Sequence, residues 1–252
     1  MRYQNNGFFK EDQLVMSLDK KKYSQISFAF RPILVSMFGN LDDDDIIYCY
    51  KFEDYTKPDF VIEVKDAKHF VSMKTTSVYV HQEKIESFIM FLKELGISDK
   101  TCETFLKYQF GDGTTDGSGH HRDPYNVVFA RLQADIQEAN RELNADQEIM
   151  WKVISRCLFQ GVNQNAIPAD YLFMGDAQGG HIVSRGQVYK YIRLKDWDFI
   201  ENLHIGPLLF NPHARYVDKD VPERFNGRFL VDAKWPNLDK DIMYIERKFT
   251  SI

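Results

Sequence analysis

The sequence predicts an α/β fold with a mixed, mostly antiparallel central β-sheet flanked by helices, and two features predict it. The first is a β-hairpin: residues 58–64 and 69–75 alternate between apolar and polar, with a polar turn between them. The second is an amphipathic helix directly after the hairpin, at residues 82–95, which Gly96 closes. Strands that adjoin amphipathic helices in this way form a sheet covered by helices.

Two helices and a strand are predicted before the hairpin. Residues 10–18 are expected to form a short helix, because their apolar side chains recur at helical spacing. Arg31–Phe38 is expected to form a second helix, with a proline in its first turn and Gly39 at its end. A run of aspartates then separates this helix from an apolar strand at residues 46–52.

The second half of the chain is expected to add a loop, three helices, a strand and an irregular tail. The loop is rich in glycine and aspartate, the third helix is short and capped by Ser184, and the tail contains strands and loops. In chain order these are the loop 111–119, helices 124–143 and 146–160, the strand 171–174, the helix 186–193, and the tail from Trp197 onward.

The composition is that of one globular domain. The chain has 252 residues, of which 44% are hydrophobic, and its 20 Phe and 13 Tyr supply ample core material, which excludes a wholly disordered protein. It contains neither an internal repeat nor a Pro/Gly/Ser linker. We therefore expect a single domain over residues 1–252, with a core at about 8–110 and a C-terminal elaboration at about 111–252.

The cysteines and the charge restrict the class of protein further. Three scattered cysteines argue against a disulfide scaffold and a cysteine-based zinc site, and they suit a reducing cytoplasm. The sequence starts without a signal peptide and has no run long enough to span a bilayer, so no membrane partner is expected. A net charge of −5 argues against binding nucleic acid over the whole surface. Residues 181–252 carry 12 Lys and Arg against 10 Asp and Glu, which permits a local face for nucleic acid there.

One face of the predicted hairpin carries chemistry. Pairing the strands about the turn places Asp59 opposite Lys74 and Val61 opposite Ser72. This face also carries Glu63, whereas the opposite face is entirely apolar and belongs to the core. Carboxylates, a hydroxyl and an ammonium side by side suit metal-dependent hydrolysis of phosphodiesters. The alternative is a cross-strand ion pair between Asp59 and Lys74 on a solvated face.

The residues of this hairpin resemble a known family of nucleases. Pro58-Asp59, followed after a turn by Ser72-Met73-Lys74, is similar to the motif of the PD-(D/E)xK superfamily, which includes most type II restriction endonucleases. The resemblance covers roughly residues 8–95 and implies a restriction endonuclease-like core. It also implies Mg²⁺ or Mn²⁺ as the cofactor, with Asp59 as a metal ligand and Lys74 beside the attacking water.

The sequence departs from that motif at Ser72, where the family usually has a carboxylate. The resemblance implies that a helix-borne Glu83 replaces it as the second metal ligand, with Gln82 as an alternative. Glu63 is a further accessory candidate, although on one strand it lies about 13 Å from Asp59, too far for the two to share a metal. By the same resemblance, Glu11 on the first helix is expected to assist.

Target recognition is expected in the C-terminal part of the chain. Arginine, lysine and glutamine side chains contact phosphates and base edges, although surface charge alone also accounts for most of them. The candidates are Arg185, Gln187, Lys190, Arg193, Arg224 and Arg228.

Together these features indicate a metal-dependent endonuclease that hydrolyses double-stranded DNA. A type II restriction enzyme is the first interpretation, and the resemblance then implies a homodimer that uses no nucleotide cofactor. Two alternatives stay open. One is a structure-specific repair or junction nuclease of the same superfamily, and the other is a nucleic-acid or protein binding module that has lost catalysis.

Overall fold

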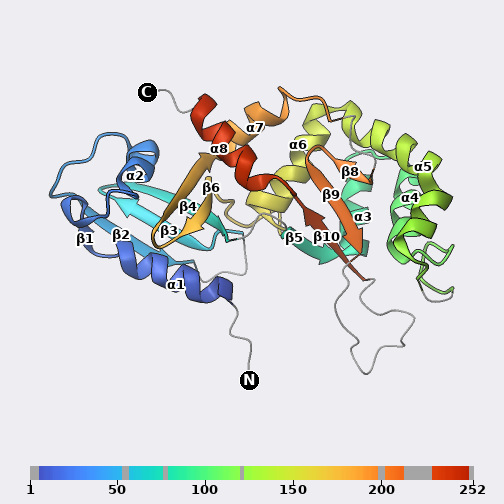
Figure 1. The fold of residues 1–252 in the computed structure, drawn as a ribbon, viewed down its shortest axis with the longest axis horizontal. Helices are drawn as coiled ribbons and strands as arrows, with labels where there is room; N and C mark the ends of the chain where they lie inside the picture. Colours follow the sequence, from blue (N-terminus) through green and yellow to red (C-terminus); the bar gives the residue numbers. More distant parts are fainter. Residues whose placement is uncertain are drawn as a thin grey trace, which may run out of the picture. The chain divides into compact units, whose positions relative to one another are not determined.

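The protein has a mixed α/β fold with two β-sheets, which confirms the predicted fold class (Figure 1). The computed structural model describes residues 6–52, 57–75, 79–119, 122–197, 202–212 and 229–249. The chain divides into two compact units: unit 1 comprises Met1–Ser77, Leu158–Tyr191 and Asn237–Ile252, and unit 2 comprises Val78–Cys157 and Ile192–Pro236. Each unit therefore draws on both sides of residue 110, the expected end of the core.

Unit 1 contains a six-stranded sheet, in which the strands lie in the order β1-β2-β3-β4-β6-β7. All neighbouring pairs are antiparallel except β4 and β6, which run parallel. The sheet is therefore mostly antiparallel, as the sequence indicates. Its strands are β1 (Lys21–Lys22), β2 (Ile46–Lys51), β3 (Phe60–Val64), β4 (Ala67–Lys74), β6 (Tyr171–Asp176) and β7 (Gly179–Ser184).

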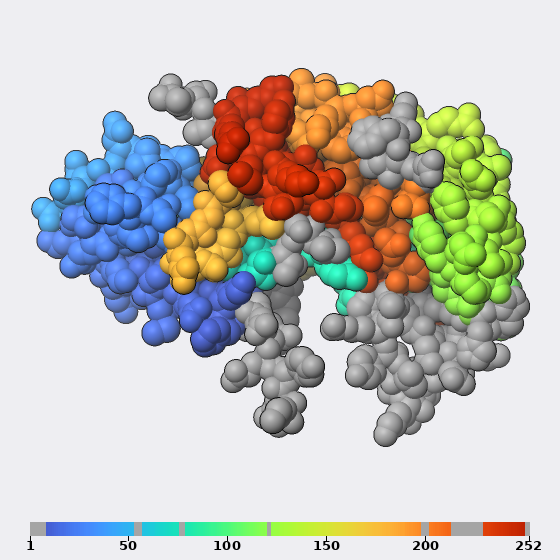
Figure 2. Space-filling view, in the orientation of Figure 1, coloured from blue at the N-terminus to red at the C-terminus, as the bar shows by residue number. Residues whose placement is uncertain are grey.

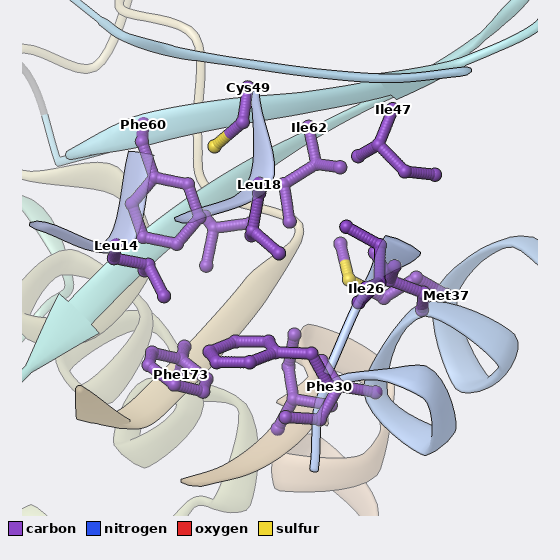
Figure 3. Packing of buried hydrophobic residues seen from close by; sticks show 14 of the residues in the cluster. Leu14, Leu18, Ile26, Phe30, Met37, Ile47, Cys49, Phe60, Ile62 and Phe173 are labelled. Atoms are coloured by element: carbon purple, nitrogen blue, oxygen red, sulfur yellow. The ribbon is translucent and has the colours of Figure 1, made fainter. Parts of the chain in front are cut away.

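Helices α1 (Asn6–Leu18) and α2 (Arg31–Phe38) cover one face of this sheet and enclose the core of unit 1. The α2 helix begins and ends as predicted, with a proline in its first turn and Gly39, at a φ of 76° that favours glycine, at its end. Figure 3 shows the core side chains pointing toward one another from helices and strands. Those labelled there are Leu14, Leu18, Ile26, Phe30, Met37, Ile47, Cys49, Phe60, Ile62 and Phe173.

Replacing Leu34 in α2 by alanine is expected to destabilise unit 1 by about 2–5 kcal/mol, because the side chain is fully buried and its removal leaves a cavity. Its neighbour Val35 is 40% exposed and is the matched control, for which Val35→Ala is expected to change stability by less than about 0.5 kcal/mol. Urea denaturation followed by circular dichroism measures both variants. Equal effects of the two variants would show that the described core does not stabilise this unit.

The β3–β4 hairpin is present, but its register differs from the predicted one by two residues. Phe60 pairs with Val71 and Val64 with Ala67, so the turn is the two-residue connection 65–66, in which Lys65 has a left-handed φ of 54°. The expected pairing of Asp59 with Lys74 was therefore wrong. Because side chains alternate with a period of two, a shift of two residues leaves every side chain on its predicted face. The predicted apolar face is indeed the core face: it carries Phe60, Ile62, Val64, Val71 and Met73.

The C-terminal helix α8 (Leu238–Phe249) belongs to unit 1 and packs beside β7, and the red atoms of the C-terminal part adjoin gold atoms of the sheet in Figure 2. Glu246 holds it there, since its carboxylate accepts a hydrogen bond from Ile182 N at 3.2 Å and lies 2.6 Å from Nδ1 of His181. The sequence predicted only an apolar end to an irregular tail, so this helix was missed. The short helix α7 (Arg185–Ile192) was predicted correctly: Ser184 Oγ accepts a hydrogen bond from Gln187 N at 3.1 Å.

Unit 2 contains a four-stranded antiparallel sheet in the order β5-β10-β9-β8, together with four α-helices in its described residues. The strands are β5 (Tyr79–Lys84), β8 (His204–Ile205), β9 (Leu208–Pro212) and β10 (Leu230–Lys234). The helices are α3 (Ile85–Glu94), α4 (Asp99–Phe110), α5 (Tyr125–Ala145) and α6 (Gln147–Ser155), and a π-helical turn, Arg156–Gln160, follows α6. No helix in the described ranges is long and apolar enough to cross a membrane.

Two predictions for this unit need correction. The helix expected at residues 82–95 begins only at Ile85, because residues 79–84 pair with β10 as strand β5. The α4 helix was not predicted, although Ser98 caps its start by accepting a hydrogen bond from Thr101 N, and Gly111 ends it in the left-handed region.

Candidate active site

Asp59 lies immediately before β3, where its side chain extends the hydrogen-bond ladder of the hairpin. Its backbone N donates to Val71 O at 2.8 Å, and its carboxylate oxygen Oδ2 accepts from Met73 N at 2.5 Å. The same oxygen accepts from the hydroxyl of Ser72 at 3.3 Å. The carboxylate is thus fixed against β4 through Oδ2, which leaves Oδ1 available to a ligand.

Lys74 ends β4 and is connected to Asp59 through Ser72. Its Nζ donates to Ser72 Oγ and to Met73 O, both at 3.1 Å. The alternation of β4 explains this arrangement, since the Ser72 hydroxyl contacts Asp59 Oδ2 and Lys74 follows Ser72 by two residues on the same face. In the part of the chain that the structure describes, Asp59 and Lys74 form no direct salt bridge, so Ser72 joins them. Ser72 is fully buried.

Glu11 of α1 lies in the same electrostatic environment. Partial burial and the negative charge of Asp59 raise the pKa of Glu11, and the positive charges of Lys51 and Lys74 oppose that rise. Asp59 and Glu11 therefore lie close enough for their charges to interact, and the assisting role that the family resemblance implies for Glu11 stays a prediction.

These side chains fit a hard divalent cation in their chemistry. Mg²⁺ is commonly bound through one or two carboxylates, and water and phosphate oxygens complete its shell. The negative charge of Asp59 disfavours the charged form of Glu11, and a cation near both would relieve that repulsion. Among the described residues, no group of three or more His, Cys, Asp or Glu side chains is placed to hold a metal ion.

Glu83 lies in a different environment, on β5 of unit 2. Its carboxylate forms a two-pronged ion pair with Arg156, with Nε to Oε1 at 3.0 Å and Nη2 to Oε2 at 2.7 Å. His81 Nε2 lies 3.2 Å from Oε1, and Ser87 Oγ donates to Oε2 at 3.2 Å. The guanidinium of Arg156 also lies 4.4 Å from the ring centroid of Phe91. Both carboxylate oxygens of Glu83 therefore have partners within unit 2.

The surroundings of Glu83 keep it charged although it is buried. Burial alone would raise the pKa of Glu83, but hydrogen bonds from His81 and Arg156 and their positive charges outweigh it and lower the pKa to about 2. Gln82, the alternative candidate, donates through Nε2 to Asp232 Oδ1 of β10 at 2.8 Å. A metal-binding function for Glu83 or Gln82 stays a prediction.

Glu63, the accessory candidate, lies on the outer face of the unit 1 sheet. It pairs with Tyr48 of β2 and Lys68 of β4, and its Oε2 accepts from the hydroxyl of Tyr50 at 3.3 Å. These partners place it among aromatic side chains, four residues along β3 from Asp59.

The predicted DNA-contacting residues are divided between the units. Arg185, Gln187 and Lys190 lie on α7, where Gln187 Oε1 accepts from Ser184 N at 2.7 Å and so helps to start the helix. Arg193 belongs to unit 2, donates to Gln147 Oε1 at 3.1 Å and lines an open cleft of about 390 Å³ with Lys195, Trp197 and others. Arg224 and Arg228 lie outside the described residues.

Sequence reasoning missed the buried Arg156, because an arginine in a helix that also carries Glu148 and Lys152 gives no local signal of burial. It also passed over Tyr48 and Tyr50, although their alternation along the strand was visible.

Comparison with known proteins adds no relative. Neither the protein-family models nor the curated proteins that were searched contain a match to this chain.

Proposed function

We propose that this protein is a metal-dependent nuclease that hydrolyses phosphodiester bonds of double-stranded DNA at the Asp59–Lys74 hairpin. The observation that supports it is the hydrogen-bonded chain from Asp59 through Ser72 to Lys74, with the Glu11 carboxylate nearby. The Asp59 carboxylate is fixed by Met73 N, and the Lys74 ammonium is held by Ser72, two residues before it on β4. The two groups therefore form a preorganised pair of opposite charges.

In this proposal each residue acts on a different part of the reaction. Asp59 and Glu11 would hold Mg²⁺ or Mn²⁺, and the bound cation would supply Lewis-acid chemistry to the phosphate and to the attacking water. The Lys74 ammonium donates a hydrogen bond to the attacking water or to the phosphate oxygen on which negative charge develops. Ser72 keeps Lys74 in place and contributes no charge of its own.

We assign the second carboxylate to Glu11 rather than to Glu83. Both oxygens of Glu83 are engaged by Arg156, His81 and Ser87, so binding a metal would first break a buried ion pair. In contrast, burial and the charge of Asp59 disfavour the charged form of Glu11, and a nearby cation would stabilise that form.

Incubating the protein with plasmid and phage DNA in Mg²⁺, in Mn²⁺ and in EDTA tests the proposal. We expect cleavage in either metal and none in EDTA. Discrete fragments would indicate a restriction enzyme that acts as a homodimer, and cleavage confined to four-way junctions or flaps would indicate a structure-specific nuclease. Binding without cleavage in every metal and substrate would overturn the proposal and favour a binding module.

A further inference from the structure

The outer face of the unit 1 sheet carries exposed aromatic rings beside the candidate site. Tyr48 and Tyr50 alternate along β2 on the face opposite the core, and they are 43% and 38% exposed. Tyr50 pairs with Val61 of β3, and Val61 pairs with Phe70 of β4. The rings therefore share a face with Asp59, Ser72 and Lys74. We call the surface formed by Tyr48, Tyr50, Lys68 and Phe70 the aromatic face.

A lysine lies among these rings. Nζ of Lys68 is 5.4 Å from the ring centroid of Tyr50 and 5.2 Å from that of Phe70. Phe52 packs edge-on against Phe70, with 5.2 Å between centroids, and the Tyr50 hydroxyl donates to Glu63. These contacts fix the rings of Tyr50 and Phe70, so the surface is ordered before any partner arrives.

Exposed rings next to a cation are the components of a site for unpaired nucleotides. Bases stack on aromatic side chains whatever their sequence, and a nearby ammonium attracts the phosphate of the same strand. Side chains two residues apart on a strand are separated by about 7 Å, which lets Tyr48 and Tyr50 contact different bases. Glu63, which lies among the rings, is about 13 Å along β3 from Asp59.

We propose that the aromatic face binds unpaired bases of the DNA strand whose phosphodiester is cut at Asp59 and Lys74. This inference rests on the proposed function and makes it more specific, because the substrate then includes a single-stranded segment such as a flap, an overhang or a bulge. Lys68 and Glu63 are cross-strand neighbours in this surface, and the centres of protein interfaces are depleted in charged residues, so a surface that combines both charges with exposed rings fits nucleotides better than a protein.

The test measures binding separately from cleavage. Fluorescence anisotropy in EDTA gives the Kd of a labelled oligo(dT) and of a blunt duplex of the same length. Tyr48→Ala and Tyr50→Ala are each expected to raise the Kd for oligo(dT) about tenfold, because each removes one stacking ring. Tyr48→Phe keeps the ring and is expected to bind like the unmodified protein.

Tyr79→Ala is the matched control, because Tyr79 is also an exposed strand tyrosine, with Lys234 Nζ 4.8 Å from its ring centroid, but lies in unit 2. It is expected to leave the Kd unchanged. The inference is overturned if oligo(dT) does not bind, or if the three alanine variants have the same Kd for oligo(dT). It is also overturned if the Tyr48 and Tyr50 variants change only the mass measured by sedimentation, which would identify a self-association surface. Weakened binding in those two variants without any metal-dependent cleavage would support the aromatic face and reject the nuclease.

Discussion

Replacing Lys74 by alanine is expected to lower metal-dependent cleavage of DNA by a factor of about 10² or more, because the reaction loses the ammonium that orients water or stabilises developing charge. The substitution removes two hydrogen bonds, to Ser72 Oγ and Met73 O, from a partly exposed side chain, so the fold is expected to survive. Initial rates on a plasmid substrate in Mg²⁺ measure the effect, and circular dichroism monitors the fold.

Lys84→Ala is the control for this experiment, since Lys84 is an exposed strand lysine in unit 2. It is expected to cleave at the unmodified rate. Asp59 offers a less selective test, because its removal also leaves Met73 N without its carboxylate acceptor and weakens the hairpin. Unchanged cleavage by Lys74→Ala would remove this lysine from the reaction and with it the proposed site.

Replacing Arg156 by alanine is expected to destabilise unit 2 by about 3–5 kcal/mol, because the charge of Glu83 would then be buried beside one fewer cation. All three tryptophans, Trp151, Trp197 and Trp235, lie in unit 2, so urea denaturation followed by tryptophan fluorescence reports on this unit. Arg141→Ala on the exposed side of α5 is the matched control and is expected to change stability by less than about 0.5 kcal/mol.

The same ion pair is expected to make the stability of unit 2 depend on pH in the acid range. The pKa of Glu83 is about 2 in the folded protein and close to its ordinary value of 4.5 when unfolded, so the charged form favours folding. This contribution to stability is about 3 kcal/mol. It is fully present above the pKa of Glu83 in the unfolded chain and is lost as the pH falls toward the pKa of Glu83 in the folded protein. Denaturation midpoints between about pH 5 and pH 2 are expected to fall less steeply in Glu83→Gln, which lacks the titrating group.

Glu83→Gln also separates the two functions considered for this residue. If Glu83 acts only through the ion pair, the variant loses stability, and the protein that remains folded cleaves DNA normally. Abolished cleavage in fully folded protein would instead support the metal ligand that the family resemblance implies, and would contradict our assignment of Glu11.

The sequence predicted best what depends on neighbours in the chain. Asp59, Ser72 and Lys74 belong to one hairpin, so alternation alone placed them on one face. The register was wrong by two residues because it depends on the left-handed φ of Lys65, which the residue type does not indicate.

What depends on distant partners could not be predicted. Residues 82–84 read as the start of a helix, yet β10, about 150 residues later, draws them into a strand, where Gln82 meets Asp232. The ion pair of Glu83 and Arg156 likewise joins residues 73 positions apart. The local spacing of residues predicts neither contact, because pairing between distant segments overrides local propensity.

The order in which the ribosome releases the chain bears on unit 1. Strand β4 pairs with its parallel neighbour β6 about a hundred residues later, and helix α8, which Glu246 ties to β7, follows later still in the chain. The β3–β4 hairpin therefore emerges from the ribosome with the edge of β4 open, and the sheet is completed only when β7 has been made, more than a hundred residues after β4. Removing α8 would therefore take its contacts with His181 and Ile182 away from a sheet whose first strands are translated long before this helix.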